Sequence, residues 1–242
     1  MKKGTYLIKA TPKQVEWLTF ATNQALRIHI GQLTDPLTVL LTFEFAYARH
    51  HQGKLCPQDV EERLEKLSRK CWVGTPNGYA YSEKSSALWN LYQLFKSHNG
   101  LSGIQSYTVD RYQLCCLREA TEQASRLRVG QTRESMLDEL LSAYSRSHDK
   151  GTEDINAWQE ARPEITAELD ELHRICWDMP TYASYGLGYD ACSDGWWNMY
   201  EAIRYILWKE EHPNPSDSDR LCVSAYPPLP LGDQPLIEIS RL

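Results

Sequence analysis

Two similar stretches of the sequence decide the fold. Residues 21–32 read ATNQALRIHIGQ, and residues 120–131 read ATEQASRLRVGQ, 99 positions further along the chain. Seven of the twelve positions are identical, and Ile28/Leu127 and Ile30/Val129 exchange one aliphatic side chain for another. Similarity at a fixed distance indicates an internal repeat, so the chain is predicted to be a tandem duplication of a unit of about 100 residues.

Two further matches follow in the same order. Residues 67–72 (LSRKCW) resemble residues 172–177 (LHRICW), and residues 87–96 (ALWNLYQLFK) resemble residues 195–204 (GWWNMYEAIR). The offset grows from 99 to 105 and then to 108, as insertions in connecting loops would produce. The prediction is a pseudo-twofold protein with repeats at 1–98 and 107–211, a linker at 99–106 and a proline-rich, extended tail at 212–242.

Each unit is predicted to be mainly α-helical, with a short extended segment before its first helix. Thr11 and Asp110 are suited to cap a helix, and a glutamine three residues later can reach back to the cap. Gly31 and Gly130 follow the apolar helical pattern where a helix-ending glycine belongs. Extended segments are expected at 5–9 and 105–109, and helices at 12–30, 35–50, 57–72 and 84–97, then at 111–129, 133–147, 156–177 and 191–210.

The charge balance limits the classes of partner. The net charge is −6 and the pI is about 5.7. Nucleic acids and anionic membranes are bound by clustered basic residues, so neither is expected, whereas a few arginines suffice for a small anion. No apolar run approaches the roughly 18 residues of a membrane span, and no signal-type segment is present. We therefore expect a cytoplasmic protein, whose seven cysteines without a CxxC pair stay reduced.

The first repeated block supplies candidate anion-binding residues. Arg27 and Arg126 occupy the same position in the two copies, Gln131 follows the second copy's helix, and Arg128 lies two residues after Arg126. The planar guanidinium group can donate two hydrogen bonds to a phosphate or carboxylate. The alternative is that these arginines pair with carboxylates of their own unit and that the glutamine caps the helix.

Aromatic residues crowd around glycines in the second copy. They could stack on a nucleobase while a nearby arginine meets a phosphate. The alternative is that Trp89/Trp197 and Tyr92/Tyr200, three residues apart on one helical face, are core anchors. The candidate ligand-binding residues of this region are Tyr185, Tyr189, Trp196, Asn198, Tyr200 and Arg204, with Tyr81 in the first copy.

The sequence predicts no catalytic residue, no metal site and no cofactor. It contains no GxSxG, phosphate-binding P-loop or GxGxxG motif in a suitable context. Two glutamate clusters could in principle hold magnesium, but they equally fit a solvated helix face beside basic partners. These clusters are Glu61, Glu62 and Glu65, and Glu164, Glu168 and Glu171.

The first block also resembles a known signature. It is similar to the A-(L/T)-E-x-x-x-R-(I/L)-x-(M/V)-G-Q pattern of small phage and prophage proteins that lack an assigned function. Gly186-Leu-Gly-Tyr189 followed by Trp197–Arg204 resembles the later segment of the same proteins. The first copy departs from that pattern with Ala80 and with Phe95-Lys96, which puts any site there in doubt.

This resemblance implies a binding protein of phage origin. Helical phage proteins without a catalytic signature are often counter-defence proteins, and one class sequesters cyclic nucleotide or ADP-ribose-derived immune signals. The first hypothesis is therefore a non-enzymatic protein that captures a small anionic, nucleotide-like ligand in the host cytoplasm. The alternatives are an inhibitor or adaptor of a host protein, with Trp196 and the tail as interface anchors, and an all-helical Mg-dependent nucleotide hydrolase. Each is compatible with a homo-oligomer.

Overall fold

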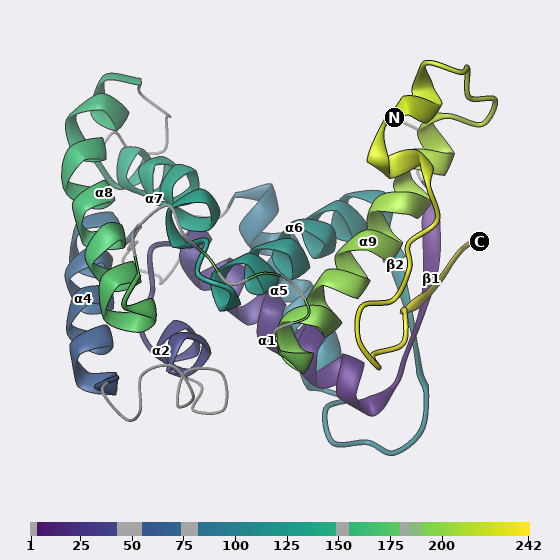
Figure 1. Cartoon of the computed structure of the whole chain (residues 1–242), viewed down its shortest axis with the longest axis horizontal. Coiled ribbons are helices and arrows are strands. Elements are labelled where there is room, and N and C mark those ends of the chain that lie inside the picture. The colour runs from purple at the N-terminus through teal and green to yellow at the C-terminus, as the bar shows by residue number, and fades with distance from the viewer. Residues whose placement is uncertain are drawn as a thin grey trace.

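The computed structural model shows a mainly helical protein with one small sheet (Figure 1). The structure describes residues 4–42, 55–73, 82–148, 155–179, 184, 186, 188 and 190–242. The mainly helical class expected from the sequence is confirmed. Within these ranges, no helix is long and apolar enough to cross a membrane.

The helices follow the predicted bounds closely. In the first half they are α1 (Pro12–His29), α2 (Pro36–Leu41), α4 (Pro57–Cys71) and α5 (Glu83–Lys96). In the second half they are α6 (Arg111–Arg128), α7 (Thr132–His148), α8 (Ile155–Trp177) and α9 (Ala191–Glu211). The predicted helix 35–50 is observed only as α2, and residues 43–54 lie outside the described part of the chain.

The local signals act as expected at the first helix of each half. Thr11 and Gln14 form a reciprocal capping box before α1, and Asp110 and Gln113 form the same box before α6. Gly31 and Gly130 have φ values of 73° and 97°, which a residue with a Cβ adopts only with strain. At Gly31 a Cβ would also overlap the backbone carbonyl of Cys71.

A three-stranded antiparallel sheet joins distant parts of the chain. The strand order is β2 (Gln105–Asp110), β1 (Thr5–Ala10) and β3 (Glu238–Arg241). The first two were predicted as extended segments; β3 was not predicted. Ile8 lies opposite Tyr107, the residue 99 positions later. On either side of this pair, Leu7 lies opposite Thr108 and Lys9 lies opposite Ser106, so the β1–β2 pairing is symmetric about Ile8 and Tyr107.

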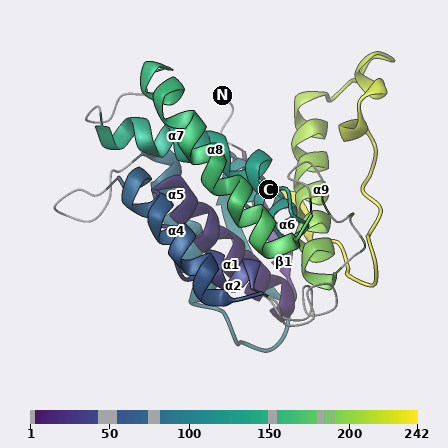
Figure 2. The same cartoon turned by 60° about the vertical axis from the view of Figure 1, so that its left-hand side comes forward.

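The helices pack in matching pairs. α1 packs on α5, α6 packs on α9, and α1 and α6 cross each other beside the sheet (Figures 1 and 2). α4 and α8 lie together with α7 at the other end of the molecule. The buried hydrophobic residues described form one cluster drawn from both halves, so the two predicted repeats share a core.

Buried polar contacts join helices within and between the two halves. Gln24 of α1 donates to the side-chain oxygen of Gln123 of α6 at 3.1 Å. The His29 ring bonds to Ser82, the N-cap of α5, and to Glu139 of α7, both at 2.8 Å. At the matching place in the second half, Arg128 donates at 2.9 Å to Asp190, the N-cap of α9.

The C-terminal segment folds back over the body. Two short 3-10 turns (Asp219–Leu221 and Val223–Ala225) follow α9, and the chain then returns to place β3 against β1. The buried Asn198 side chain donates to the carbonyls of Leu231 and Gln234 and accepts from the Leu231 N–H. Asn198 was a candidate ligand residue, but these three bonds occupy it in holding the C-terminal segment.

Candidate functional site

A cavity lies where α1, α5 and the start of α9 meet; we call it the aromatic cavity. Its volume is about 390 Å³, within the range of roughly 300–1,000 Å³ of small-molecule sites. It is lined by Lys13, Glu16, Trp17, Thr19, Phe20, Asn23, Tyr92, Lys96, Asn99, Cys192 and Trp196.

Two tryptophans form the most buried part of this wall. Trp17 and Trp196 are 4% and 1% exposed, and the Trp196 indole donates to the Trp17 carbonyl at 2.9 Å. Phe20 stacks on Trp196 with ring centroids 5.9 Å apart. Gly195 makes this packing possible, because a Cβ at that position would overlap the six-membered ring of Trp17.

The remaining rings and charges lie nearer the solvent. Phe20 and Tyr92 are half-buried, and the exposed Lys96 ammonium lies 5.2 Å from the centre of the Tyr92 ring. Lys13 forms an ion pair with Glu16 at 2.8 Å and lies 5.6 Å from the centre of the Trp17 ring. The wall therefore combines aromatic faces with a net positive charge.

One buried donor in this wall has a sulfur atom as its neighbour. The Trp17 indole N–H is buried and lies against the Cys192 thiol, whose sulfur is only a weak acceptor. Burial raises the pKa of that thiol, so it is protonated near neutral pH. The N–H is covered by the protein and is not open to the cavity.

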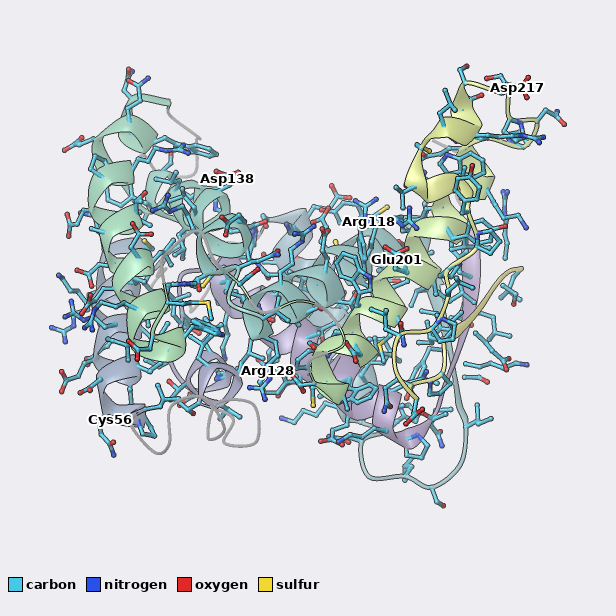
Figure 3. All side chains as sticks on the ribbon, in the orientation of Figure 1. Cys56, Arg118, Arg128, Asp138, Glu201 and Asp217 are labelled. Atoms are coloured by element: carbon cyan, nitrogen blue, oxygen red, sulfur yellow. The ribbon has the colours of Figure 1, made fainter. Side chains whose placement is uncertain are left out.

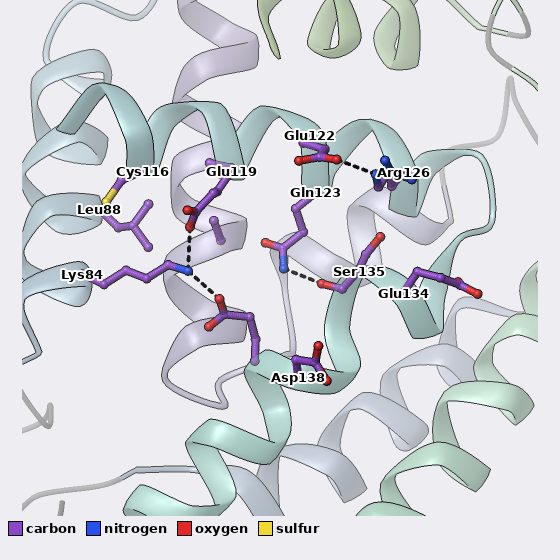
Figure 4. A pocket seen from close by; sticks show the side chains of 13 residues that line it. Lys84, Leu88, Cys116, Glu119, Glu122, Gln123, Arg126, Glu134, Ser135 and Asp138 are labelled. Atoms are coloured by element: carbon purple, nitrogen blue, oxygen red, sulfur yellow. Dashed lines mark hydrogen bonds and ion pairs between the residues drawn. The ribbon is translucent and has the colours of Figure 1, made fainter. Parts of the chain in front are cut away.

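A second cavity has the opposite charge; we call it the acidic cavity (Figure 4). It lies between α6, α7 and the start of α5, and its volume is about 260 Å³. Its lining carries five carboxylates, those of Glu119, Glu122, Glu134, Asp138 and Glu139. Two cations, Lys84 and Arg126, oppose them, so the acidic cavity disfavours an anion.

Lys84 is held inside the acidic cavity by two carboxylates. Its ammonium pairs with Glu119 at 2.9 Å and with Glu139 at 2.5 Å (Figure 4). Burial raises the pKa of Glu139, but hydrogen bonds from His29 and Lys84 and their charges outweigh it and lower the pKa to about 2. The Lys84 pKa is raised because the two carboxylates outweigh its burial.

The two cavities occupy matching places in the repeat numbering. Trp17 and Phe20 of the aromatic cavity are offset by 99 residues from Cys116 and Glu119 of the acidic cavity. Cys192 and Trp196 are offset by 108 residues from Lys84 and Leu88. Each cavity is thus formed by the first helix of one half and the start of the last helix of the other half.

The candidate arginines of the first block are already engaged. Arg126 donates to Glu122 at 2.8 Å and to Gln131 at 2.6 Å, and it lines the acidic cavity. Arg27 bonds to Asn23 and lies 3.7 Å from Asp35. Arg128 is fully buried, donates to the Leu40 carbonyl as well as to Asp190, and lines neither cavity. These contacts match the alternative of intramolecular pairing.

Other candidates gather on the face between α6 and α9. The Arg126 guanidinium lies 5.7 Å from the centre of the Trp197 ring, and Trp197 contacts Tyr200 with centroids 4.9 Å apart. Arg204, mostly buried, pairs with Glu201. Figure 3 labels Glu201 on α9 and Arg118 on α6, the helix packed against it. Of this group, Arg126 lines the acidic cavity, whereas Trp197, Tyr200 and Arg204 line neither cavity.

The aromatic residues differ from their expected environments. Trp196, considered as an exposed interface anchor, is buried in the aromatic cavity. Trp89, considered as a core anchor, is 43% exposed, and Trp197, Tyr92 and Tyr200 are only half-buried. Tyr81, Tyr185 and Tyr189 lie outside the described residues.

The second glutamate cluster is part of the α4–α8 contact. Glu168 pairs with Arg63 and Lys66, Glu164 with Lys70, and Glu171 with Arg63 and Arg174. Elsewhere on α4, Glu65 pairs with Arg69. Among the residues that can be placed, no three His, Cys, Asp or Glu side chains are grouped to hold a metal ion.

Sequence reasoning missed Trp17 and Phe20, the central residues of the aromatic cavity. They lie on α1, three residues apart, and read as ordinary core positions. The available signal was a mismatch between the repeats, because aromatic rings at 17 and 20 correspond to Cys116 and Glu119. A core position seldom exchanges an aromatic ring for a carboxylate.

Comparison with known proteins gives no further assignment. No protein-family model matches the chain, and no curated protein or solved structure is significantly similar to it.

Proposed function

We propose that the chain is a non-enzymatic binding protein that captures a small anionic, nucleotide-like ligand in the aromatic cavity. The observation that carries this proposal is the combination of aromatic rings and a lysine without an ion-pair partner among the described residues. Rings stack on nucleobases irrespective of sequence, and an ammonium group meets phosphate. Tight capture needs only such contacts in a preformed pocket.

The proposal includes an origin by tandem duplication. The same order of a strand and four helices in the two halves supports it, as do the matching capping boxes. Exchange of equivalent residues is a second support. The offset of 105 makes Arg63 equivalent to Glu168 and Lys66 equivalent to Glu171, and across α4 and α8 Arg63 pairs with Glu171 and Lys66 with Glu168. Such reciprocal contacts are typical of two like units about a twofold axis.

The proposed setting is a phage protein acting in the host cytoplasm. The sequence signature supports a phage origin, and capture without turnover fits a counter-defence protein that removes a nucleotide immune signal. The engaged carboxylates of α8 speak against the alternative of a magnesium-dependent hydrolase that uses the cluster of Glu164, Glu168 and Glu171.

A thermal-shift screen tests the proposal. Nucleotide-free protein should be stabilised by at least one cyclic nucleotide or cyclic ADP-ribose isomer, since a ligand bound to the folded state raises the melting temperature. Lys96→Glu should abolish that shift, whereas Arg204→Glu, the matched position 108 residues later, lies outside the cavity and should retain it. The proposal fails if no compound shifts the wild-type protein or if both variants respond equally.

A protein inhibitor or adaptor is the second candidate, and an exposed apolar strip favours it. Leu221, Val223 and Leu229 on the C-terminal segment are 85%, 75% and 84% exposed, and Tyr226 lies among them. Contiguous exposed apolar side chains often mark an interface. Replacing Leu221 and Leu229 by Ser should abolish a host complex without changing the thermal shift, whereas a complex that survives would exclude this surface.

A further inference from the structure

We infer that the free edge of β2 is a dimerisation surface, on which β2 of a second copy of the chain pairs antiparallel about a twofold axis at Tyr107. The three-stranded sheets of the two copies then form one continuous sheet. The inference concerns assembly of the chain and does not depend on the ligand proposed for the aromatic cavity.

The hydrogen bonds of the sheet show which backbone groups of β2 point outward. The Arg111 N–H donates to the Gly4 carbonyl at 3.1 Å, in the same register as the β1–β2 pairs. Because hydrogen-bonded pairs alternate along an antiparallel ladder, the odd-numbered residues of β2 bond to β1. The N–H and C=O groups of Ser106 and Thr108 therefore point away from β1.

This edge is open in the described part of the chain. β2 is an end strand of the sheet, with β1 as its one neighbouring strand among the described residues, and both Ser106 and Thr108 are exposed. The sheet lies at the end of the molecule opposite α4 and α8 (Figure 1). A row of outward N–H and C=O groups on an exposed edge is a template for a further strand.

The edge is complementary to a second copy of itself. In a twofold pairing centred on Tyr107, Ser106 lies opposite the partner's Thr108, and Thr108 lies opposite the partner's Ser106. Each pair exchanges two backbone hydrogen bonds, so every outward N–H and C=O of these residues gains a partner. The hydroxyl side chains of each pair lie on one face, where Ser and Thr pair favourably. Contacts that are reciprocal in this way define an isologous dimer interface.

Neighbouring residues favour this register over the adjacent ones. A pairing centred on Thr108 would place Asp110 opposite the partner's Ser106, but the Asp110 N–H already donates to the Gln113 side chain at 3.0 Å. A pairing centred on Ser106 would place Thr108 opposite the partner's Ile104, which precedes the strand. Only the register centred on Tyr107 uses both outward residues of each copy within β2.

The composition of the edge suits an identical partner. Between Leu101 and Val109 the chain has no charged residue and no proline, the residues that commonly protect an edge strand. A second copy brings the same charges, so an uncharged edge avoids like charges lying opposite each other. The other edge strand, β3, carries Glu238 and Arg241. Leu101 and Ile104, 48% and 65% exposed, add apolar surface beside β2.

Sedimentation of the full chain tests the inference. The wild type should convert from monomer to dimer between about 1 µM and about 1 mM. Thr108→Pro removes an outward N–H and leaves the bonds to β1 in place, so it should raise the dissociation constant of the dimer at least about tenfold. Thr108→Val keeps the N–H and the branched shape; it is the matched control and should dimerise as the wild type does. Circular dichroism and melting curves check that both variants fold.

Amide hydrogen exchange gives a second readout on unaltered protein. The amides of Ser106 and Thr108 should exchange at least about fivefold more slowly at the high concentration than at the low one. Those of Tyr107 and Val109 bond to β1 in the monomer, so they should be protected at both concentrations. Alternation along a single strand is specific to pairing at this edge.

The outcomes separate this inference from the proposed function. A wild type that stays monomeric over the whole range overturns the inference, as does a dimer that forms equally well with Thr108→Pro. A dimer without slower exchange at Ser106 and Thr108 uses another surface and also overturns it. Neither residue lines the aromatic cavity, so the ligand-induced thermal shift should persist in Thr108→Pro, and its presence or absence in the wild type judges the proposed function alone.

Discussion

The aromatic cavity and the acidic cavity are built at corresponding places on the two halves and differ in nearly every side chain that faces the space. Trp17 and Phe20 line the first, and Cys116 and Glu119 take their places in the second. The bounds and the capping boxes of α1 and α6, the first helix of each half, match. The difference indicates that helices with the same caps and bounds can carry very different side chains where they face a cavity.

The charge difference has a physical consequence for binding. The lining of the aromatic cavity contains two lysines and one glutamate, whereas the acidic cavity contains five carboxylates and two cations. An anion that binds in the aromatic cavity would be repelled by the carboxylates of the acidic cavity. One ligand per chain is therefore expected, despite the two matching cavities.

The largest difference in stability between the halves is expected on substitution of His29 and Arg128, which occupy matching positions. Arg128→Leu should lower the free energy of unfolding by about 3–5 kcal/mol, because it leaves the Asp190 carboxylate buried without its cation. His29→Leu should have a smaller effect, since Glu139 keeps Lys84 as a partner. Urea denaturation measures both, and equal losses would show that the two junctions are energetically alike.

Gly195 on α9 allows a second comparison of the two cavities, because it packs against Trp17. Gly195→Ala should destabilise the protein by about 3 kcal/mol and abolish ligand binding in the aromatic cavity, because the new Cβ overlaps the Trp17 ring. The matched residue is Ala87, which already carries a Cβ, and Cys116 stands at the position that corresponds to Trp17. Ala87→Gly, assessed by the same denaturation and by calorimetry, should leave ligand binding unchanged; loss of binding there would contradict the assignment.

Asn198 and Asn90 are identical residues in different environments. Asn198→Ala should lower the free energy of unfolding by about 2 kcal/mol, because buried backbone groups of the C-terminal segment lose their partners. Asn90 is exposed, and Asn90→Ala should change stability by less than about 0.5 kcal/mol. Faster amide exchange at Leu231 in the Asn198 variant alone would confirm that Asn198 holds the C-terminal segment, and unchanged exchange would refute it.

The smallest effect is expected on the stability at acid pH, and it concerns Glu139 of the acidic cavity. The Glu139 pKa is lowered to about 2, so this carboxylate stabilises the fold above its unfolded value near 4.5 and loses that contribution as the pH falls towards 2. Glu139→Gln should remove about 1–2 kcal/mol of this pH dependence. The matched residue is Leu40, which has no charge to lose. Melting temperatures between pH 6 and pH 3 measure the difference, and parallel curves for variant and wild type would contradict it.

Much of the secondary structure could be predicted from local sequence. The observed α1, α6, α4, α8, α5 and α9 agree with the expected ranges within about two residues, the usual uncertainty of helix ends. Cap residues such as Thr11 and Asp110 identify these boundaries because they bond only to atoms three residues away. The strand β3 was missed, since an edge strand of four residues depends on its partner strand.

The candidate site depends on tertiary contacts. The sequence indicated Trp196 as a ligand-binding candidate, or as an exposed anchor in the alternative, and the structure places it buried in the cavity wall. It also named Arg128 and Asn198 as ligand candidates, and the structure shows both bonded within the protein. Residue type alone does not distinguish an arginine that binds a ligand from one that caps a neighbouring helix. The distinction depends on which residues from distant segments lie opposite.

The sequence by itself determined the mainly helical class, the helix boundaries and the correspondence between residues 99 to 108 apart, because these depend on periodicity, caps and self-similarity along the chain. The tertiary structure alone decided that both halves share one core, that the C-terminal segment returns to the sheet, and that two cavities of opposite charge form between first and last helices of different halves. A cavity is a property of surfaces brought together from distant segments, so it emerges only when the helices have packed.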